Sequence, residues 1–432
     1  MQDADEPPTL TTPAPRPAPP GAPPPPARPG WRQLGPGLVV AATGVGAGDL
    51  VATLIAGSRF GYALLWAAIV GCLVKIALSE GSARYHLATG STILAGWRTL
   101  GRWTSWYFGA YVIVWGFIYG ATAMSATALP LAALFPAVPL PAWAVLAGLS
   151  GFAFVWFNRY ETFERVMKVL TGIMFVVMVG LAILVAPDLE DLASGLALRL
   201  PQGSAFYTLG LVGGVGGTIT TAAYGYWVQA KGWNGLPWLP LMRLDNAVAY
   251  VVTGVFVVAM LIVGAELLHA AGIALEDNER GLLGLADVLE ARLGRPVALA
   301  FLIGFTATAF SSILGVWHGM SLFFADWWYQ ARGGATGGQT HEHSPAFRFY
   351  LAWLTFPPML LLFADRPLLL VVIYGAFGAL FMPFLAITLL LLLNAPALPR
   401  EARNGWLANG VLAGSALLFA VLAVQQVAAL VG

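Results

Sequence analysis

Charged residues are scarce in this sequence. Asp, Glu, Lys and Arg make up 10% of the 432 residues, whereas soluble domains carry about 25%. Hydrophobic residues make up 58% of the chain. A soluble fold could not cover that much apolar surface, so the composition predicts an all-α polytopic membrane protein that lies in a lipid bilayer.

Cysteine is also nearly absent, since Cys72 is the only one and lies within an apolar segment. This excludes a disulfide framework and a cysteine-based metal site. The formal net charge is +1 and no basic stripe exists, so we expect no nucleic-acid partner. We find no nucleophile–base set and no nucleotide motif, so we expect neither an enzyme nor a cofactor. The sequence leaves the oligomeric state open.

Proline is concentrated at the N-terminus, where twelve of the 29 prolines lie within the first 30 residues. Such a segment cannot bury a core, so residues 1–33 are predicted to be a disordered cytoplasmic tail. It has no charged region followed by an apolar one and therefore does not resemble a signal peptide. Residues 34–432 are predicted to form the transmembrane domain.

Eleven apolar segments after the tail are long enough to cross a membrane. Their approximate limits are 35–57, 61–88, 104–130, 141–157, 163–186, 206–230, 245–269, 297–325, 347–364, 368–393 and 407–431. With a cytoplasmic N-terminus, the inside segments carry more than twice as many Lys and Arg as the outside ones. This bias predicts a multi-pass protein of the cytoplasmic membrane, with its N-terminus inside and its C-terminus outside. An amphipathic stretch, 282–293, falls in the longest outside loop.

Two of the segments contain glycine runs. The first has glycines at 44, 46 and 48, followed by Asp49, and the sixth contains a run from Gly210 to Gly217. Broken backbone within a membrane is tolerated only where it is buried in protein or lines a watery cavity. Two breaks five segments apart predict a 5+5 inverted repeat, 34–186 and 206–393, with a shared site at the midplane. Segment 407–431 is an additional helix.

A broken helix frees backbone carbonyls that, with a carboxylate, suit a hard cation. Asp49 is our candidate charged ligand, although an aspartate there also fits a helix N-cap. The spacing of the second glycine run equally fits close helix packing. Thr218, Thr220 and Thr221 either line a cation path or bond back to helix carbonyls.

Few other polar residues lie within the apolar segments. Glu80 is near the inner end of the second segment, and Ser311 and Ser312 are in the eighth. Glu266 and His269 are one turn apart near the predicted outer surface. They could contact an entering cation or relay a proton, or they could simply form a solvated helix end.

Several motifs resemble the Nramp family of divalent metal transporters. They are Gly35-Pro36-Gly37, Gly57-Ser58-Arg59-Phe60-Gly61-Tyr62-Ala63-Leu64-Leu65-Trp66, Glu164-Arg165-Val166-Met167-Lys168, Tyr224-Gly225-Tyr226-Trp227-Val228-Gln229-Ala230-Lys231-Gly232-Trp233 and Phe310-Ser311-Ser312-Ile313-Leu314-Gly315-Val316-Trp317. The resemblance runs from about residue 34 to the end of the tenth segment and is strongest in the first two. It implies a LeuT-like fold.

The sequence departs from that family at both breaks. Where the family has Asp-Pro-Gly-Asn, this chain has Gly46-Ala47-Gly48-Asp49, so its carboxylate is moved about one turn. Where the family has Met-Pro-His-Asn, this chain has Gly217-Thr218-Ile219-Thr220. The resemblance then places the metal at Asp49, Gly46, Gly217 and Thr220, with the carbonyls of Ala47 and Gly214 nearby.

Without the thioether and the histidine, we expect a harder cation such as Mn²⁺ or Mg²⁺. The third segment has no acidic residue, whereas the family uses such residues for proton movement, so uniport is as plausible as symport. The predicted function is import of a divalent cation by alternating access. The alternative is transport of a small organic solute or amine, with a Na⁺ site at Ser311 or Ser312 and an aromatic cage that includes Tyr224, Tyr226 and Trp227.

Overall fold

The computed structural model describes residues 30, 33–214, 216–270, 279–333, 341–363 and 367–431. Most of the Pro-rich tail therefore lies outside the described residues. The described part is helical and contains no strand. Seven helical stretches in it are long and apolar enough to cross a membrane.

All eleven predicted segments coincide with helices. The first half comprises α1 (Pro36–Gly44), α2 (Ala47–Phe60), α3 (Leu65–Thr89), α5 (Arg102–Leu134), α6 (Leu140–Phe157) and α7 (Tyr160–Leu184). The second comprises α9 (Ala205–Gly214), α10 (Thr220–Ala230), α11 (Leu239–Gly264), α13 (Arg295–Ala331), α14 (Pro345–Thr355) and α15 (Pro367–Leu393). The additional helix is α16 (Trp406–Val431).

Short elements join these helices. They are α4 (Ile93–Thr99), α8 (Leu189–Ser194), α12 (Glu279–Leu293), 3-10 turns at Gly61–Leu64, Leu236–Trp238, Pro357–Phe363 and Arg400–Ala402, and a π-helical turn at Ala265–His269. The sequence specifies several of their ends. Gly90 ends α3 in a left-handed conformation, and the Thr92 hydroxyl caps α4 by accepting a hydrogen bond from the Ala95 amide (3.3 Å). The predicted amphipathic stretch 282–293 lies within α12.

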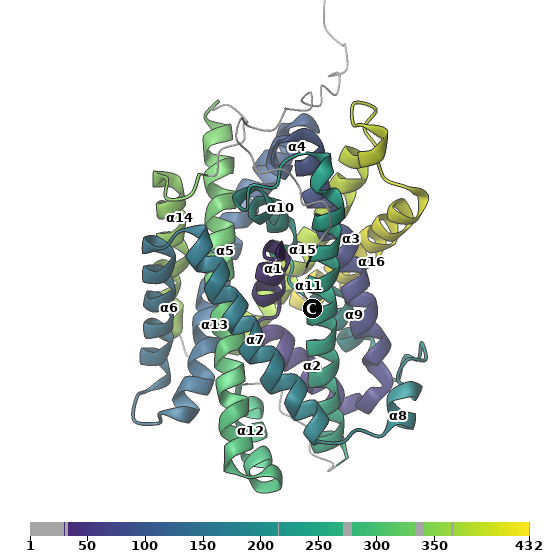
Figure 1. The fold of residues 1–432 in the computed structure, drawn as a ribbon. Coiled ribbons are helices and arrows are strands. Elements are labelled where there is room, and N and C mark those ends of the chain that lie inside the picture. Colours follow the sequence, from purple (N-terminus) through teal and green to yellow (C-terminus); the bar gives the residue numbers. More distant parts are fainter. Residues whose placement is uncertain are drawn as a thin grey trace, which may run out of the picture.

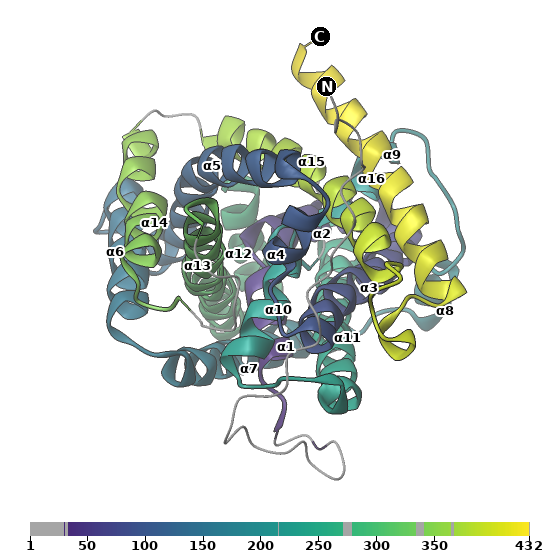
Figure 2. The ribbon, with the colours of Figure 1, turned by 90° about the horizontal axis from the view of Figure 1, so that it is seen from above.

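One half of each broken helix lies inside the bundle. Figure 1 shows α1 and α10 at its centre, enclosed by long helices. Viewed from above in Figure 2, α6 and α14 lie at one side and α16 at the other. The half-helix α1 packs against α7, α10, α11 and α13. The prediction of an interrupted first and sixth membrane helix is therefore confirmed.

Glycines let the central helices approach closely. A Cβ on Gly315 of α13 would lie 1.8 Å from the Thr43 hydroxyl oxygen of α1. At the other end of the first broken helix, a Cβ on Gly57 of α2 would lie 2.4 Å from the Leu261 carbonyl oxygen of α11. Any side chain at these positions would force the helices apart, so the positions of α1 and α2 depend on them.

Candidate functional site

The two breaks touch each other. A Cβ on Gly44, the last residue of α1, would lie 2.4 Å from the Gly216 carbonyl oxygen. A Cβ on Gly217 would lie 3.0 Å from the Gly44 Cα. Gly216 and Gly217 have φ angles of +78° and +87°, which L-residues with side chains rarely adopt. Glycine is thus required here both for backbone conformation and for contact between the two chain segments.

The second break holds a buried lysine. Lys75 of α3 has no exposed surface, and its Nζ donates to the Gly213 carbonyl (3.0 Å) and to the Gly217 carbonyl. The Met382 Sδ of α15 lies 3.8 Å from the same nitrogen. The ammonium therefore satisfies carbonyls that the interrupted helix leaves without helical partners. Its charge also lies near the C-terminal end of α9, where the helix dipole favours a cation.

The first break is bounded by hydroxyl groups of α13. Ser311 Oγ donates to the Ala42 carbonyl (2.9 Å) and Ser312 Oγ to the Thr43 carbonyl (3.0 Å). The Tyr119 hydroxyl of α5 lies 2.7 Å from Ser312 Oγ. All three hydroxyl-bearing side chains are buried. Neutral oxygens thus gather at the C-terminal end of α1, where an electropositive group is favoured.

The predicted metal ligands lie at these breaks. Gly46 is the N-cap of α2, and Gly214 ends α9. Thr220 begins α10 and is buried, and its hydroxyl oxygen would lie 2.4 Å from a Cβ on Gly217. Ala47 and Asp49 are in the first turn of α2, and their side chains are outside the described part. Because Gly46 occupies the N-cap, the alternative of an N-cap role for Asp49 is wrong.

The remaining threonines also lie close to the second break. Thr221 Oγ1 donates to the Gly217 carbonyl at 3.3 Å, which is the back-bonding that the sequence left as an alternative. Thr218 is buried, and a Cβ on Gly378 of α15 would lie 2.9 Å from its methyl carbon. These contacts place both residues beside the break.

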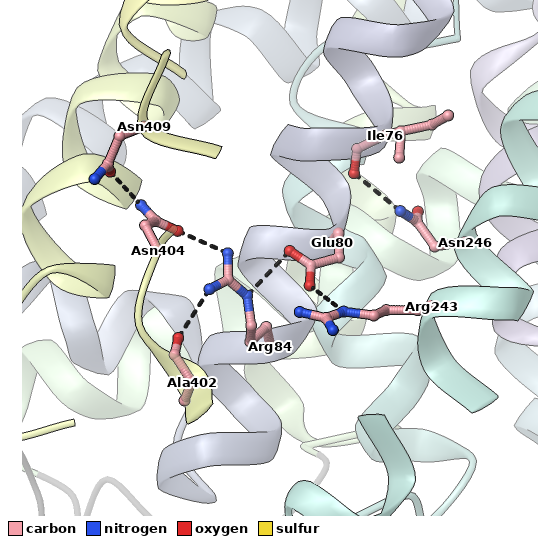
Figure 3. Close-up of polar contacts among 8 residues, drawn as sticks. All are labelled: Ile76, Glu80, Arg84, Arg243, Asn246, Ala402, Asn404 and Asn409. Atoms are coloured by element: carbon pink, nitrogen blue, oxygen red, sulfur yellow. Dashed lines mark hydrogen bonds and ion pairs between the residues drawn. The ribbon is translucent and has the colours of Figure 1, made fainter. Parts of the chain in front are cut away.

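Glu80 is part of an ion-pair network rather than of the breaks. Its carboxylate binds Arg84 (3.0 Å) and Arg243 of α11 (3.0 Å). Arg84 also donates to the Ala402 carbonyl and to Asn404, as Figure 3 shows. The network ties α3 and α11 to the segment that precedes α16. These contacts account for a buried arginine without any transported ion.

Glu266 and His269 lie at the end of α11. The Tyr62 hydroxyl donates to Glu266 Oε1 (2.5 Å), and His269 Nδ1 is 3.0 Å from the Ser58 carbonyl. Glu266 and His269 belong to the π-helical turn Ala265–His269. Their hydrogen bonds connect this turn to the end of α2 and to the 3-10 turn that follows α2. His269 is exposed, whereas Glu266 is partly buried.

Sequence reasoning missed a contact between Asp245 and the start of α1. Asp245 is buried, and its carboxylate accepts hydrogen bonds from the amides of Gly35 (2.9 Å) and Gly37 (2.5 Å) and from the Tyr224 hydroxyl (2.9 Å). We call these four residues the α1 latch. Glu164 of α7 lies against Gly35 and binds Lys231 (2.7 Å), so the same end of the bundle is closed by charge-assisted bonds.

The aromatic residues of α10 also point into this closed end. Tyr226 donates to Asp326 (2.5 Å), and the Trp227 indole donates to His318 Nδ1 (3.2 Å). The other ring nitrogen of His318 is 3.1 Å from Glu342 Oε1. Burial raises the pKa of the Glu342 carboxyl, but the hydrogen bond with His318, together with the neighbouring histidines and a backbone hydrogen bond from Tyr160, lowers it more, and the net shift is downward. With Tyr224 in the α1 latch, the polar groups of all three aromatic residues bind partners away from the breaks.

Comparison with known proteins gives the same fold. The chain is 24% identical over 303 residues to the divalent metal cation transporter MntH of Mycobacterium tuberculosis, covering 67% of this chain and 69% of that protein. It is 27% identical over 259 residues to MntH of Chromohalobacter salexigens, covering 55% and 58%. A solved manganese transporter of Eremococcus coleocola superposes with a TM-score of 0.77 at 15% identity, covering 98% of this chain and 91% of that one.

The fold extends to more distant transporters. MhsT, solved in complex with L-phenylalanine, superposes with a TM-score of 0.57 at 17% identity and covers 90% of this chain and 97% of that one. These similarities confirm the predicted LeuT-like architecture of a multi-pass membrane protein. The family model described as natural resistance-associated macrophage protein-like matches residues 37–429. Because that match spans nearly the whole chain, the protein belongs to the Nramp family.

Proposed function

We propose that this chain is a secondary transporter of the cytoplasmic membrane that imports a divalent metal cation by alternating access. The observation that carries the proposal is the contact between the α1–α2 and α9–α10 breaks at the centre of the bundle. Two broken helices that meet supply backbone carbonyls and helix ends for a bound ion. Divalent metal transport is also the activity named for its MntH relatives.

Asp49 is the proposed charged ligand. Its place in the first turn of α2 puts it three residues after Gly46, at the edge of the break. The carbonyls of Gly46, Ala47, Gly214 and Gly217 and the Thr220 hydroxyl would complete an oxygen shell. Such a shell favours Mn²⁺ or Mg²⁺ over softer ions. The Met382 thioether is a soft donor near this shell, but it lies 3.8 Å from the Lys75 ammonium.

The test is uptake into proteoliposomes that contain the purified chain. We expect saturable uptake of Mn²⁺ or Mg²⁺ by the wild type and a loss of at least tenfold in Asp49→Ala, because a carboxylate ligand is removed. Asp188→Ala is the matched control, since Asp188 is exposed and caps only α8. Retained uptake in Asp49→Ala would contradict the ligand assignment, and a strong Cd²⁺ preference would contradict the preference for hard cations.

Alternating access requires that the bundle open at one end while the other is closed. The α1 latch and the Glu164–Lys231 pair support this, because they close the end where α1 begins. Opening that end would break bonds to Asp245 and separate α1 from α7 and α10. The absence of acidic residues from α5 favours uniport over proton symport.

A second candidate is transport of a small organic solute coupled to Na⁺. The oxygens of Ala42, Thr43, Ser311 and Ser312 at the first break favour it, because a small monovalent cation binds such neutral groups. Thermal stabilisation by amines, compared in sodium and choline salts, distinguishes this candidate from divalent transport. Stabilisation by divalent ions alone would exclude it.

A further inference from the structure

The surroundings of Lys75 resemble an ion-binding site with the ion already attached to the chain. The Nζ atom contacts two carbonyl oxygens of the α9–α10 region and the Met382 thioether. It also lies 5.6 Å from the centre of the Phe419 ring of α16, which is a cation–π distance. These groups come from the broken helix, α15 and α16, and all of them offer electron-rich atoms to a positive charge.

Burying the charge of Lys75 is costly. A lysine without exposed surface loses its hydration, and that loss must be offset by hydrogen bonds and nearby dipoles. The Gly213 and Gly217 carbonyls lose their helical partners where the backbone is interrupted, and the Gly217 carbonyl accepts a long hydrogen bond from Thr221 Oγ1 (3.3 Å), so a further donor or a cation is favoured there. The ammonium meets both requirements at once. A mobile monovalent cation at the same place would meet the second one equally well.

We propose that Lys75 is a tethered cation that permanently occupies a monovalent-cation site at the α9–α10 break. The site is formed by the Gly213 and Gly217 carbonyls, with the Met382 thioether and the Phe419 ring around it. Lys75 thereby makes this half of the transporter independent of a soluble coupling ion. The inference rests on the proposed function only for its consequence for the cargo, because the monovalent-cation site itself is defined by the groups around Lys75.

This occupancy has a consequence for specificity. The Gly217 carbonyl is one of the proposed metal ligands, and it already accepts a hydrogen bond from Lys75. A fixed positive charge beside a metal site repels the incoming ion and lowers its affinity. The cargo is therefore directed toward the α1–α2 side of the shared break, where Thr43 and Ser312 lie. Lys75 acts as a specificity-determining residue without being a metal ligand.

The test removes the tether and asks whether a mobile cation replaces it. Full-length wild type, Lys75→Ala and Lys75→Gln are purified, and their melting temperatures are measured in sodium, lithium, potassium and N-methylglucamine chloride at equal ionic strength without divalent ions. The wild-type response to each salt is the baseline. Lys75→Arg keeps a tethered cation, and Lys168→Ala removes a partly exposed lysine that pairs with Glu164 near the start of α7.

We expect a saturable rise in melting temperature with sodium, lithium or potassium in Lys75→Ala and Lys75→Gln, beyond the baseline, and no such gain in Lys75→Arg or Lys168→Ala. If the neutral variants fold only when one of these small cations is present during purification, that rescue is the same result. Folded neutral variants with only the wild-type response would overturn the proposal, as would variants that no monovalent cation restores. Since no divalent ion is used, the outcome is separate from that of the uptake assay.

Discussion

The contact between Gly315 of α13 and Thr43 of α1 gives a quantitative prediction. A Cβ at position 315 would lie 1.8 Å from the Thr43 hydroxyl oxygen, 2.5 Å from its Cβ and 2.6 Å from its Cγ2. All three distances are far below van der Waals contact, so Gly315→Ala must push α1 away from α13. Overpacking of this kind costs about 1–3 kcal/mol. It would also displace the Thr43 carbonyl from Ser312, at the edge of the proposed site.

Gly172→Ala is the matched control for this change. Gly172 is in α7, and a Cβ there meets no atom within 4 Å. Each Gly→Ala replacement gains about 1 kcal/mol of helix propensity, so the difference between the two variants isolates the clash. We expect Gly315→Ala to melt at a lower temperature and to transport less, and Gly172→Ala to match or exceed the wild type in stability.

A double variant refines the test. Adding Thr43→Ala removes the hydroxyl and the methyl group but keeps the Cβ that lies 2.5 Å away. Partial restoration of the melting temperature is therefore expected. If Gly315→Ala is as stable and as active as Gly172→Ala, the close approach of α1 and α13 is not a constraint on the transporter.

Two further predictions concern the closed end of the bundle. Asp245→Asn removes one of the acceptors that bind the amides of Gly35 and Gly37, which costs about 1–3 kcal/mol. In a Cys72→Ala background, a cysteine introduced by Val39→Cys should then react faster with a thiol reagent, whereas Asp188→Asn should leave its reaction rate unchanged. An unchanged rate in Asp245→Asn would contradict the role of the α1 latch. Because the pKa of Glu342 is lowered in the folded chain, its contribution to stability is fully present above its ordinary value of 4.5 and is lost as the pH falls below that value. Glu342→Gln should flatten the acid side of a plot of melting temperature against pH, and an unaltered acid slope would argue against the His318–Glu342 pair.

The helices could be predicted because hydropathy is a local property. Each segment from 35–57 to 407–431 is long and apolar enough to reveal itself, and Gly44, Gly46 and Gly217 mark the breaks because glycine is costly within a helix. The spacing of the two breaks, five segments apart, then predicted the relation between the two halves, and the family resemblance agreed with that prediction. The sequence also singled out Ser311 and Ser312 as candidates for a Na⁺ site, although it could not identify the Ala42 and Thr43 carbonyls that they bind.

The contacts that complete the site could not be predicted in the same way. Lys75 and Gly217 are separated by 142 positions, and Asp245 and Gly35 by 210. Nothing in the periodicity of α3 or α11 indicates which distant backbone groups those side chains reach, since this depends on how the helices pack. The choice of Gly46 rather than Asp49 as the N-cap likewise follows from the extended backbone of Gly46, with ψ close to 180°.

The Phe419 ring over Lys75 shows that the two halves of the bundle are not chemically equivalent. The α9–α10 break has a fixed charge with the Phe419 ring of α16 over it, whereas the α1–α2 break has the neutral hydroxyls of α13. The two breaks would therefore not contribute equally to a shared ion site. Since the breaks touch each other, an ion bound between them would have a fixed positive charge on one side and neutral oxygens on the other.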